Sequence, residues 1–334
     1  MVSSRRSMLR AAAAAAVLPL PAFAQQQPLQ LRISTVAPEA EPTTRALRSF
    51  AQKVEAALPG RVKADVFPGG SLFRQGTEIT AIQRGQLESA TPLFFEFDQQ
   101  LPQWGALGAP FAFRDGPHLL ATMRGEIGQA FYAAAQQTMQ LVALDIGYIG
   151  TRHVNLRTPV TGRTPDALQG LKLRVQPGGR AAVAIGRGLG LTPVPMPVTE
   201  VYVALRSGLI DATESPLPVT EATRVSELIQ QVVLTGHLVQ PFVLVVGEQF
   251  MGRLDEAGRT AVRQAARAAM DELYAETSGA ERSLVGTFEG RGIRFLTPDR
   301  DAFRTSCMRQ MEQEGLTARW QAGLLDRIGG VRTS

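Results

Sequence analysis

Arg174 is the residue whose surroundings most need a chemical explanation. It lies inside the apolar run 171–175 (LKLRV), which alternates like a buried β-strand. A free charge is costly to bury, so a planar guanidinium in this place needs a carboxylate partner. That partner is either a side chain of the protein, which makes Arg174 part of an internal ion pair, or the carboxylate of a bound ligand. The residues alone leave both readings open.

The sequence gives no indication of a metal site or of a disulfide bond. The three histidines, His118, His153 and His237, lie far apart and lack the spacing of metal ligands. The single cysteine, Cys307, excludes an internal disulfide and a thiolate-rich metal site. We therefore predict no metal ligands.

Hydrolase and nucleotide signatures are equally weak. The sequence has no Gly-x-Ser-x-Gly motif. Residues 186–190 (GRGLG) look like a nucleotide-binding loop, but they come at the end of a predicted helix instead of between a strand and a helix. These glycines are better explained as the end of that helix. No catalytic residue and no cofactor are predicted.

The composition is that of a globular protein with one large core or two ordinary ones. The 334 residues are 44% hydrophobic and 19% charged, with a net charge of +5. No run of Lys and Arg interleaved with aromatic residues suggests nucleic-acid binding. Nothing in the sequence demands a dimer, so we expect a monomer.

The first 24 residues resemble an export signal. Arg5, Arg6 and Arg10 form a charged segment before the apolar run 11–20, which is shorter than the roughly 20 residues that span a bilayer. Residues 22–24 (AFA) form a small-x-small cleavage site. The adjacent arginines resemble a twin-arginine (Tat) signal, and an ordinary Sec signal is the alternative. Cleavage after Ala24 removes three arginines and no acid, so the net charge falls from +5 to +2.

The elements that must position Arg174 follow from the hydrophobic pattern. The start of the chain reads βαβαβ, which indicates a parallel sheet covered by helices. Its elements are a strand at 31–35, a helix at 43–58, a strand at 62–67, a helix at 76–85 and a strand at 87–91. Helices at 117–137 and a strand at 140–146 follow.

A second α/β unit follows residue 147. We predict strands at 171–175, 192–194, 209–213 and 241–247, and helices at 180–189 and 199–207. A long helix at 255–284 and a mostly helical segment at 299–328 complete the chain. No low-complexity linker separates the units, so short crossing segments should join them.

Five motifs, in this order, resemble the solute-binding proteins of TRAP transporters, the DctP-like family of periplasmic receptors. They are FPGGSL (67–72), IQRG with LE (82–85 and 87–88), APFAFRD (109–115), GLKLRV (170–175) and EVYVAL with Gly208 and Asp211 (200–205). Each is weak alone, but the likeness covers nearly the whole chain after the signal.

The resemblance implies a two-lobed α/β protein of the periplasmic-binding-protein type II-like fold. A central ligand cleft lies between the lobes, and a long helix, here 255–284, spans both. Lobe 1 is expected to comprise residues 25–149 and about 240–280. Lobe 2 is expected to comprise 150–239 and about 281–334.

The resemblance also implies which residues contact the ligand. Arg174 matches the arginine that forms a two-pronged salt bridge with the ligand carboxylate, and Arg152 matches an assisting arginine. Ser215 stands where the family often has a ligand-contacting Asn, and Ala212 replaces a family glycine. Glu200, Tyr202 and Asp211 are expected to support the cleft wall.

The remaining contacts are expected from the first lobe, in which Phe94, Phe95 and Glu96 lie on the loop that usually faces the cleft. The two phenylalanines are equally compatible with a place in the core. Because this loop and Val36 are apolar, the resemblance implies a ligand less hydroxylated than a sugar acid.

Function follows from the same resemblance. The expected partners are a small carboxylate ligand and the TRAP membrane subunits, and the expected place is the periplasm. Two alternatives remain: a ligand-sensing partner of a signalling receptor, which would share the fold and cleft, and a Tat-exported enzyme.

Overall fold

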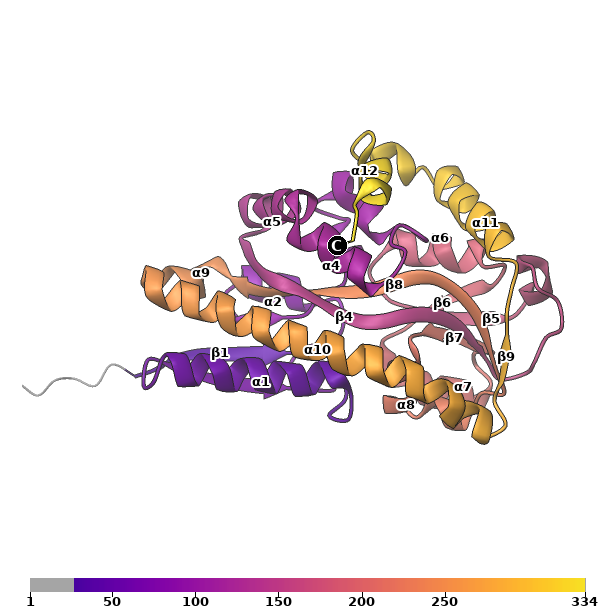
Figure 1. The fold of residues 1–334 in the computed structure, drawn as a ribbon, viewed down its shortest axis with the longest axis horizontal. Coiled ribbons are helices and arrows are strands. Elements are labelled where there is room, and N and C mark those ends of the chain that lie inside the picture. Colours follow the sequence, from indigo (N-terminus) through magenta and orange to yellow (C-terminus); the bar gives the residue numbers. More distant parts are fainter. Residues whose placement is uncertain (1–26, 334) are drawn as a thin grey trace, which may run out of the picture.

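The computed structural model describes residues 27–333, which form one mixed sheet covered by helices (Figure 1). The predicted export signal lies outside the described residues. The strands follow the order β2-β1-β3-β8-β4-β7-β5-β6, and β9 pairs with β8. Their bounds are β1 Leu29–Ser34, β2 Val62–Phe67, β3 Ser89–Ala90, β4 Leu141–Leu156, β5 Lys172–Val175, β6 Thr192–Pro195, β7 Ala212–Ser215, β8 Gln231–Gly247 and β9 Arg294–Leu296.

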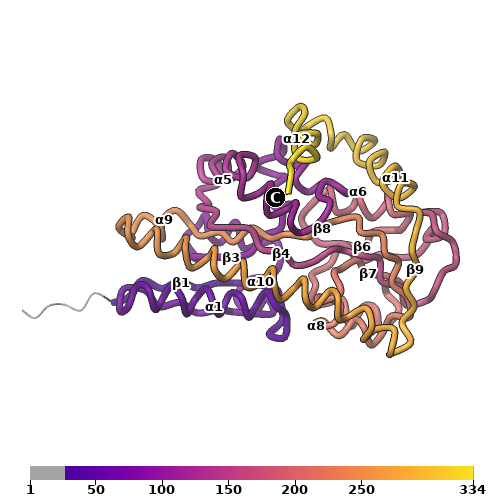
Figure 2. The backbone as a smooth tube through the Cα atoms, viewed as in Figure 1, coloured from indigo at the N-terminus to yellow at the C-terminus, as the bar shows by residue number. Residues whose placement is uncertain are grey.

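The sheet has two halves. The first half contains the parallel strands β2, β1 and β3, and the second contains the parallel strands β7, β5 and β6. Between them run β4 and β8, a long antiparallel pair that extends through both halves (Figure 2). Because parallel strands point the same way, each half offers its carboxyl ends as one edge, the usual place for a ligand in such sheets.

The two central strands are much longer than the strands predicted at 140–146 and 241–247. β4 has 16 residues and β8 has 17, and most of both strands are buried. The buried polar residues Asp145, Arg152 and Asn155 interrupt the apolar pattern of β4. Continuous pairing with β8 and β7 keeps the strand extended in spite of them. Tertiary pairing has overridden the local pattern here.

Helices cover both faces of the sheet (Figure 1). Their bounds are α1 Pro42–Ala57, α2 Glu78–Gln83, α3 Phe94–Phe97, α4 Gly116–Arg124, α5 Glu126–Met139, α6 Arg180–Gly188, α7 Val201–Ser207, α8 Leu217–Ala222, α9 Glu248–Gly252, α10 Glu256–Gly290, α11 Arg300–Gln313 and α12 Leu324–Gly330. Five short 3-10 turns lie at Pro102–Gly108, Pro165–Leu168, Val198–Glu200, Val225–Glu227 and Thr317–Arg319.

The helix α10 spans both halves. The sequence predicts a helix at 255–284, and the observed helix has 35 residues and ends six residues later, at Gly290. Asp255 caps it by accepting from the Gly258 N–H at 2.8 Å. At about 1.5 Å per residue it is roughly 50 Å long. It packs against α1 and β4 and, farther along, against α8 and β9. The predicted lobe-spanning helix is therefore confirmed, and so is the α/β fold.

One glycine of β4 sits where the chain passes from one half to the other. Gly150 has φ +126°, a conformation that side-chain-bearing residues rarely adopt, at a register shift in the β4–β8 pair. A Cβ on it would lie 2.6 Å from the Cβ of Pro216. Beside it, Glu281 of α10 accepts hydrogen bonds from the Tyr148 hydroxyl and the Thr151 N–H, both at 2.6 Å. The long helix thus fixes the crossing strand at this glycine.

Substitution Gly150→Ala tests this junction. Backbone strain and the contact with Pro216 should lower the free energy of unfolding by at least about 2 kcal/mol. Denaturant unfolding would measure it. The control is Gly279→Ala on α10, where an added Cβ meets nothing within 4 Å. That change should be neutral or stabilise by up to about 1 kcal/mol. Equal behaviour of the two variants would contradict the assignment.

Candidate ligand-binding site

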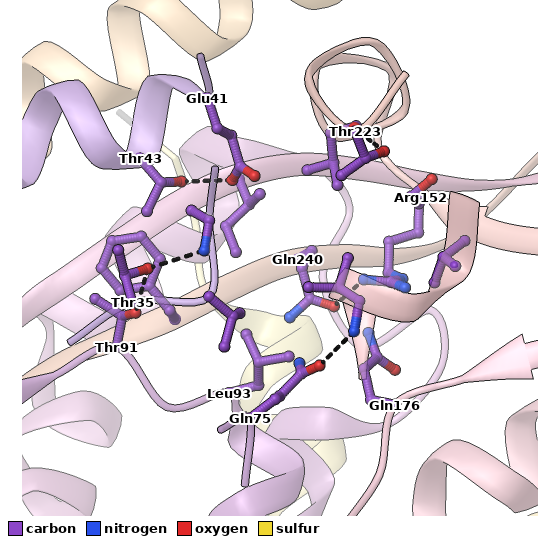
Figure 3. Close-up of a pocket in the computed structure, with 18 of the residues that line it drawn as sticks. Thr35, Glu41, Thr43, Gln75, Thr91, Leu93, Arg152, Gln176, Thr223 and Gln240 are labelled. Atoms are coloured by element: carbon purple, nitrogen blue, oxygen red, sulfur yellow. Dashed lines mark hydrogen bonds between the residues drawn. The ribbon is translucent and has the colours of Figure 1, made fainter. Parts of the chain in front are cut away.

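A cleft lies between the carboxyl ends of the two sets of parallel strands. It encloses about 790 Å³, solvent at its mouth included. Figure 3 shows Glu41 and Thr43 on one side of it and Arg152, Gln176 and Gln240 on the other. The other lining residues are Thr35, Val36, Ala37, Gln75, Glu78, Thr91, Leu93, Glu96, Ile149, Arg174, Val198, Val201, Thr213, Ser215, Val219, Thr223, Val225 and Phe242.

Strand alternation places Arg174 in this cleft. In β5 its neighbours Leu173 and Val175 are core residues, so Arg174, together with Gln176, faces the other way, into the cavity. The side chain is nevertheless only 3% exposed. Its Nε donates to the Met196 carbonyl at 2.9 Å and its Nη2 to Gln75 Oε1 at 3.2 Å. Nη1 has no hydrogen-bond partner among residues 27–333.

No carboxylate of the described chain forms an ion pair with Arg174. Burial, and next the positive charge of Arg152, lower the pKa of Arg174 to about 9, and the more distant Glu214 opposes this shift. At neutral pH the guanidinium is therefore still charged. The cleft therefore contains a buried cation, Arg174, whose Nη1 can still donate hydrogen bonds.

Arg152 of β4 lines the same cavity, but its donors are occupied. Nε donates to the Glu214 carboxylate and Nη2 to the Glu214 carbonyl. Nη1 donates to Gln240 Oε1 at 3.2 Å. The side-chain oxygen of Gln176, oriented to suit its neighbours, accepts from Nη1 and Nη2 at 2.8 Å each. All five N–H groups of Arg152 are thus satisfied inside the protein.

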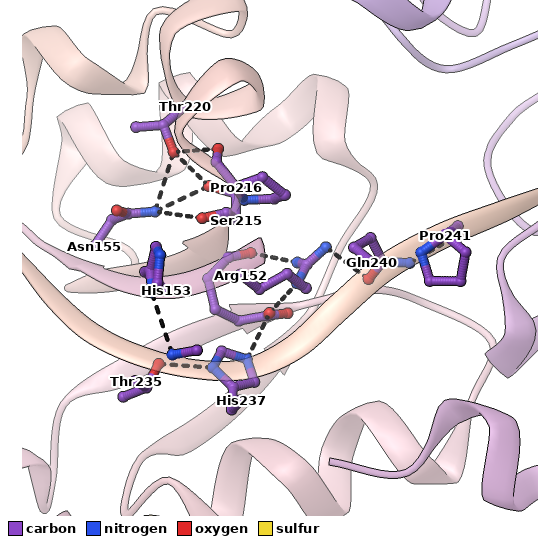
Figure 4. Close-up of polar contacts among 12 residues, drawn as sticks. Arg152, His153, Asn155, Ser215, Pro216, Thr220, Thr235, His237, Gln240 and Pro241 are labelled. Carbon is purple, nitrogen blue, oxygen red and sulfur yellow. Dashed lines mark hydrogen bonds and ion pairs between the residues drawn. The ribbon is translucent and has the colours of Figure 1, made fainter. Parts of the chain in front are cut away.

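Glu214 is the centre of a buried ionic network (Figure 4). It pairs with Arg152, and the His237 Nε2 lies 3.2 Å from its Oε2. The other ring nitrogen of His237 lies 2.8 Å from the Thr235 hydroxyl. Burial alone would raise the pKa of Glu214, but the charge of Arg152 and the hydrogen bond from His237 outweigh it and hold the pKa at about 2. Burial lowers the pKa of His237, which favours its neutral form.

Ser215 lines the cavity at the end of β7, as Thr213 does two residues earlier. Its hydroxyl accepts from Asn155 Nδ2 at 2.9 Å and lies 2.8 Å from the Thr220 hydroxyl. This polar cluster fixes the hydroxyl in place at the cavity wall (Figure 4).

Phe94, Phe95 and Glu96 lie in the short helix α3, and of these three only Glu96 lines the main cavity. The Phe94 ring packs edge-on against Phe131 in the core of the first half. Phe95 is buried in the core that extends into the second half. Both phenylalanines thus take the core position that the sequence left open. Glu96, which lies between the buried Phe95 and the buried Phe97, is the residue that reaches the cleft.

Three other residues expected at the cleft lie outside the cavity. Glu200 forms an exposed ion pair with Arg74, at 2.6 Å. Tyr202 donates to Glu227 Oε2 at 3.0 Å. Asp211 accepts from the Lys172 N–H at 2.9 Å and so ties the turn before β7 to β5. They stabilise elements next to the cavity and do not line it.

The loop between β2 and α2 joins the two halves across the cleft. Gln75 Oε1 accepts from Arg174 and, at 3.1 Å, from the Val198 N–H. Next to it, Arg74 pairs with Glu200 of the second half. Sequence reasoning missed Gln75, and also the buried acids Glu41 and Glu78. For Glu41, the only signal in the sequence was its position directly before Pro42, at the start of a predicted helix. Gln75 and Glu78 carry no such signal.

Neither a metal-ligand cluster nor a membrane-spanning helix is found in the described part of the chain. Within residues 27–333, no cluster of three or more His, Cys, Asp or Glu side chains is placed to hold a metal ion. None of the helices there has the length and apolar character needed to cross a bilayer.

An α/β fold with a cleft at the carboxyl ends of two strand sets is an arrangement that a solute-binding protein can have. The family described as bacterial extracellular solute-binding protein, family 7 (DctP) matches residues 33–314. The chain belongs to this family, whose members are the solute-binding proteins of TRAP transporters and are not enzymes. The resemblance found in the sequence is thereby confirmed, and the exported-enzyme alternative is set aside.

Individual relatives agree. A solute-binding protein of Chromohalobacter salexigens is 33% identical over 239 residues, 71% of this chain and 70% of that protein. The sialic acid-binding periplasmic protein SiaP of Vibrio cholerae is 25% identical over 77% of this chain and 79% of its own length. A TRAP periplasmic solute-binding protein of Roseobacter denitrificans, solved with bound 3-deoxy-D-manno-oct-2-ulosonic acid, has a TM-score of 0.87 and 31% identity, covering 91% of this chain and 100% of that one.

Substitution Glu214→Gln tests the buried network. It leaves the buried Arg152 without a counter-charge, so unfolding in urea at pH 7 should cost about 3–5 kcal/mol less than for wild type. Because the pKa of Glu214 is lowered from 4.5 to about 2, its stabilisation is complete above pH 4.5 and lost as the pH falls toward 2. The difference in the free energy of unfolding between wild type and Glu214→Gln should therefore shrink as the pH falls from 4.5 toward 2. The control Glu227→Gln, on an exposed pair with Arg224, should leave the midpoint nearly unchanged.

Proposed function

We propose that this chain is an exported receptor that captures a small organic carboxylate in the cleft and delivers it to the membrane subunits of a TRAP transporter. The observation that carries the proposal is Arg174: a buried, charged guanidinium that lines the cavity, has no carboxylate partner among the described residues and keeps Nη1 free. A ligand carboxylate would supply the missing counter-charge.

The chemistry of the pair sets what it can contribute. A carboxylate can accept two parallel N–H bonds from one guanidinium, which fixes the orientation of the ligand. Both ions lose water on binding, so the net free energy is much smaller than the Coulomb attraction. Specificity then depends on the other groups of the wall, among them the hydroxyls of Thr35, Thr91 and Ser215.

The known relatives support a carboxylate. SiaP of Vibrio cholerae binds sialic acid, and the Roseobacter denitrificans structure holds a ketodeoxy sugar acid; both ligands are carboxylic acids. From these relatives we infer only that the ligand of this chain has a carboxylate group, and not that it is a sugar acid.

Arg174 and Arg152 take different parts in this proposal. Arg174 binds the carboxylate, whereas Arg152, whose five N–H groups are occupied and whose charge is paired with Glu214, orients Gln176 and Gln240. Ser215 offers its hydroxyl and Glu96 its carboxylate at the wall. Phe94, Phe95, Glu200, Tyr202 and Asp211 act by holding the elements around the cleft.

Capture proceeds by closure of two lobes. We assign residues 25–149 with about 240–280 to lobe 1, and 150–239 with about 281–334 to lobe 2. The contacts of Gln75 with Arg174 and Val198, and of Arg74 with Glu200, then belong to the closed form. Hinge closure around a ligand is common to periplasmic binding proteins, and the ligand drives it only if it binds the closed form more tightly.

Export completes the proposal. Residues 1–24 carry the features of an export signal with cleavage after Ala24, and two of the named relatives, SiaP and the Roseobacter denitrificans protein, are periplasmic. The cleaved protein would then meet its ligand in the periplasm.

Thermal unfolding of the cleaved protein with a panel of small carboxylates tests the proposal, after unfolding and refolding to remove any bound ligand. A ligand at 100 times its Kd adds about 2.7 kcal/mol, a shift of several degrees. One acid class should shift wild type and the control Arg309→Ala, which alters an exposed residue of α11, but not Arg174→Ala. No shift with any acid, with Arg174→Ala merely less stable than wild type, would make Arg174 a structural residue and refute the proposal.

Closure has its own measurement. Small-angle X-ray scattering should report a smaller radius of gyration when a panel acid that stabilises wild type is added. Arg174→Ala should keep the ligand-free radius at the same acid concentration, because the acid then has no preference for the closed form. An unchanged radius in wild type at saturating acid would show that capture needs no lobe movement.

A further inference from the structure

The first half of the sheet contributes three carboxylates to the same cavity. They are Glu41, directly before α1, Glu78 at the start of α2, and Glu96 in α3. None of the three forms an ion pair with a basic side chain of the described chain. The part of the cavity wall that comes from the first half thus holds buried acids that form no ion pair.

Glu41 has the acceptor best placed for a ligand. The residue is 5% exposed, and the only hydrogen bond of its side chain within the described chain comes from the Thr43 hydroxyl to Oε1, at 2.8 Å. Oε2 stays free, and Figure 3 shows the side chain reaching into the cavity. The position is the N-cap of α1, yet the side chain caps no backbone N–H. Arg45, one turn into α1, gives its hydrogen bonds to Glu276 and the Ala40 carbonyl instead.

Glu78 and Glu96 are less available. Glu78 Oε2 accepts from the Gly76 and Thr77 N–H groups at 2.9 and 3.1 Å. Glu96 Oε1 accepts from the Leu93 N–H at 3.1 Å, and its Oε2 is buried without a partner in the described chain. Burial raises the pKa of Glu78 to about 7 and, with the repulsion from Glu78, that of Glu96 to about 8. At neutral pH Glu78 is therefore partly protonated and Glu96 mostly protonated, so these two add little negative charge to the wall.

Of the charged side chains that line the cavity, only Arg152 forms an ion pair within the described chain. Arg152 is neutralised by Glu214, so Arg174 is the one uncompensated cation among the described lining residues. It shares the cavity with Glu41, which has an open acceptor. A buried carboxylate is stabilised by a paired cation far more than by a neutral donor.

We propose, on the basis of the proposed function, that the ligand is a zwitterion: its carboxylate binds Arg174 and a protonated nitrogen donates to Glu41 Oε2. Amino acids with the two groups separated, or cyclic compounds with an amine or amidinium beside a carboxylate, have this chemistry. Polyhydroxylated acids lack the cation and would leave Glu41 uncompensated. The apolar wall residues Val36, Ile149 and Phe242 would then contact the carbon skeleton between the charged ends.

Isothermal titration of the refolded protein with matched acids tests this inference. The first arm holds β-alanine, 4-aminobutanoate, 5-aminopentanoate and proline. The second replaces each nitrogen by oxygen: 3-hydroxypropanoate, 4-hydroxybutanoate, 5-hydroxypentanoate and tetrahydrofuran-2-carboxylate. Galacturonate and ketodeoxyoctulosonate form a third arm. The proteins are wild type, Glu41→Gln, Glu39→Gln and Arg174→Ala. Glu39→Gln is the matched control, because Glu39 is exposed and pairs with Arg48.

We expect at least one nitrogen compound to bind wild type ten times or more tightly than its oxygen twin. Glu41→Gln keeps a hydrogen-bond acceptor but loses the charge, so it should weaken that compound about 30-fold, equivalent to about 2 kcal/mol, and its twin less than threefold. Glu39→Gln should bind like wild type. Ligand-free Glu41→Gln should be at least as stable as wild type at pH 8, because burial raises the pKa of Glu41 to about 7 and its ionised form is costly to the fold.

Two other results overturn the inference and differ from each other. In the first, oxygen twins or sugar acids bind as tightly as the nitrogen compounds, Glu41→Gln changes no affinity by more than threefold, and Arg174→Ala abolishes binding. The protein is then a carboxylate receptor, but its ligand is not a zwitterion. If no arm binds wild type, or Arg174→Ala binds as well as wild type, the proposed function fails and the zwitterion with it.

Discussion

The cost of burying a charge governs the centre of this protein. Four adjacent strands, β5, β7, β4 and β8, bring Arg174, Glu214, Arg152 and Gln240 to the middle of the sheet, where water is largely excluded. Arg152 and Glu214 satisfy each other, with His237 and two glutamines completing the network. Arg174 is left outside it. The network fixes the cavity wall around Arg174, the one lining arginine that has no ion-pair partner within the described chain.

The fold presents that charge by simple geometry. Parallel strands on each side of the β4–β8 pair end at the cleft, and strand alternation directs Arg174 and Gln176 into it while Leu173 and Val175 pack in the core. The helix α10, anchored through Glu281 beside Gly150, ties the crossing strand to both halves. Fold and site therefore depend on the same few crossing elements.

Much of this could be read from the sequence, and the failures have physical causes. An arginine inside an apolar strand is a strong local signal, and so is the helical period of α1 and α10. The length of β4 was hidden, because Asp145, Arg152 and Asn155 are stabilised by partners distant in sequence. Phe94 and Phe95 could not be assigned to cleft or core, since two adjacent rings in a loop carry no period. Glu41 and Gln75 were missed because their significance arises only when the two halves face each other.

The path of the chain also sets when the molecule can form. The short strand β3 completes the first half only by pairing Ser89 and Ala90 with Val246 and Val245 of β8, more than 150 residues later. The helix α1 likewise waits for α10, which brings Glu272 and Glu276 to Lys53 and Arg45. Neither half is a continuous stretch of sequence. Each half is therefore complete only when residues from both the beginning and the end of the chain are present.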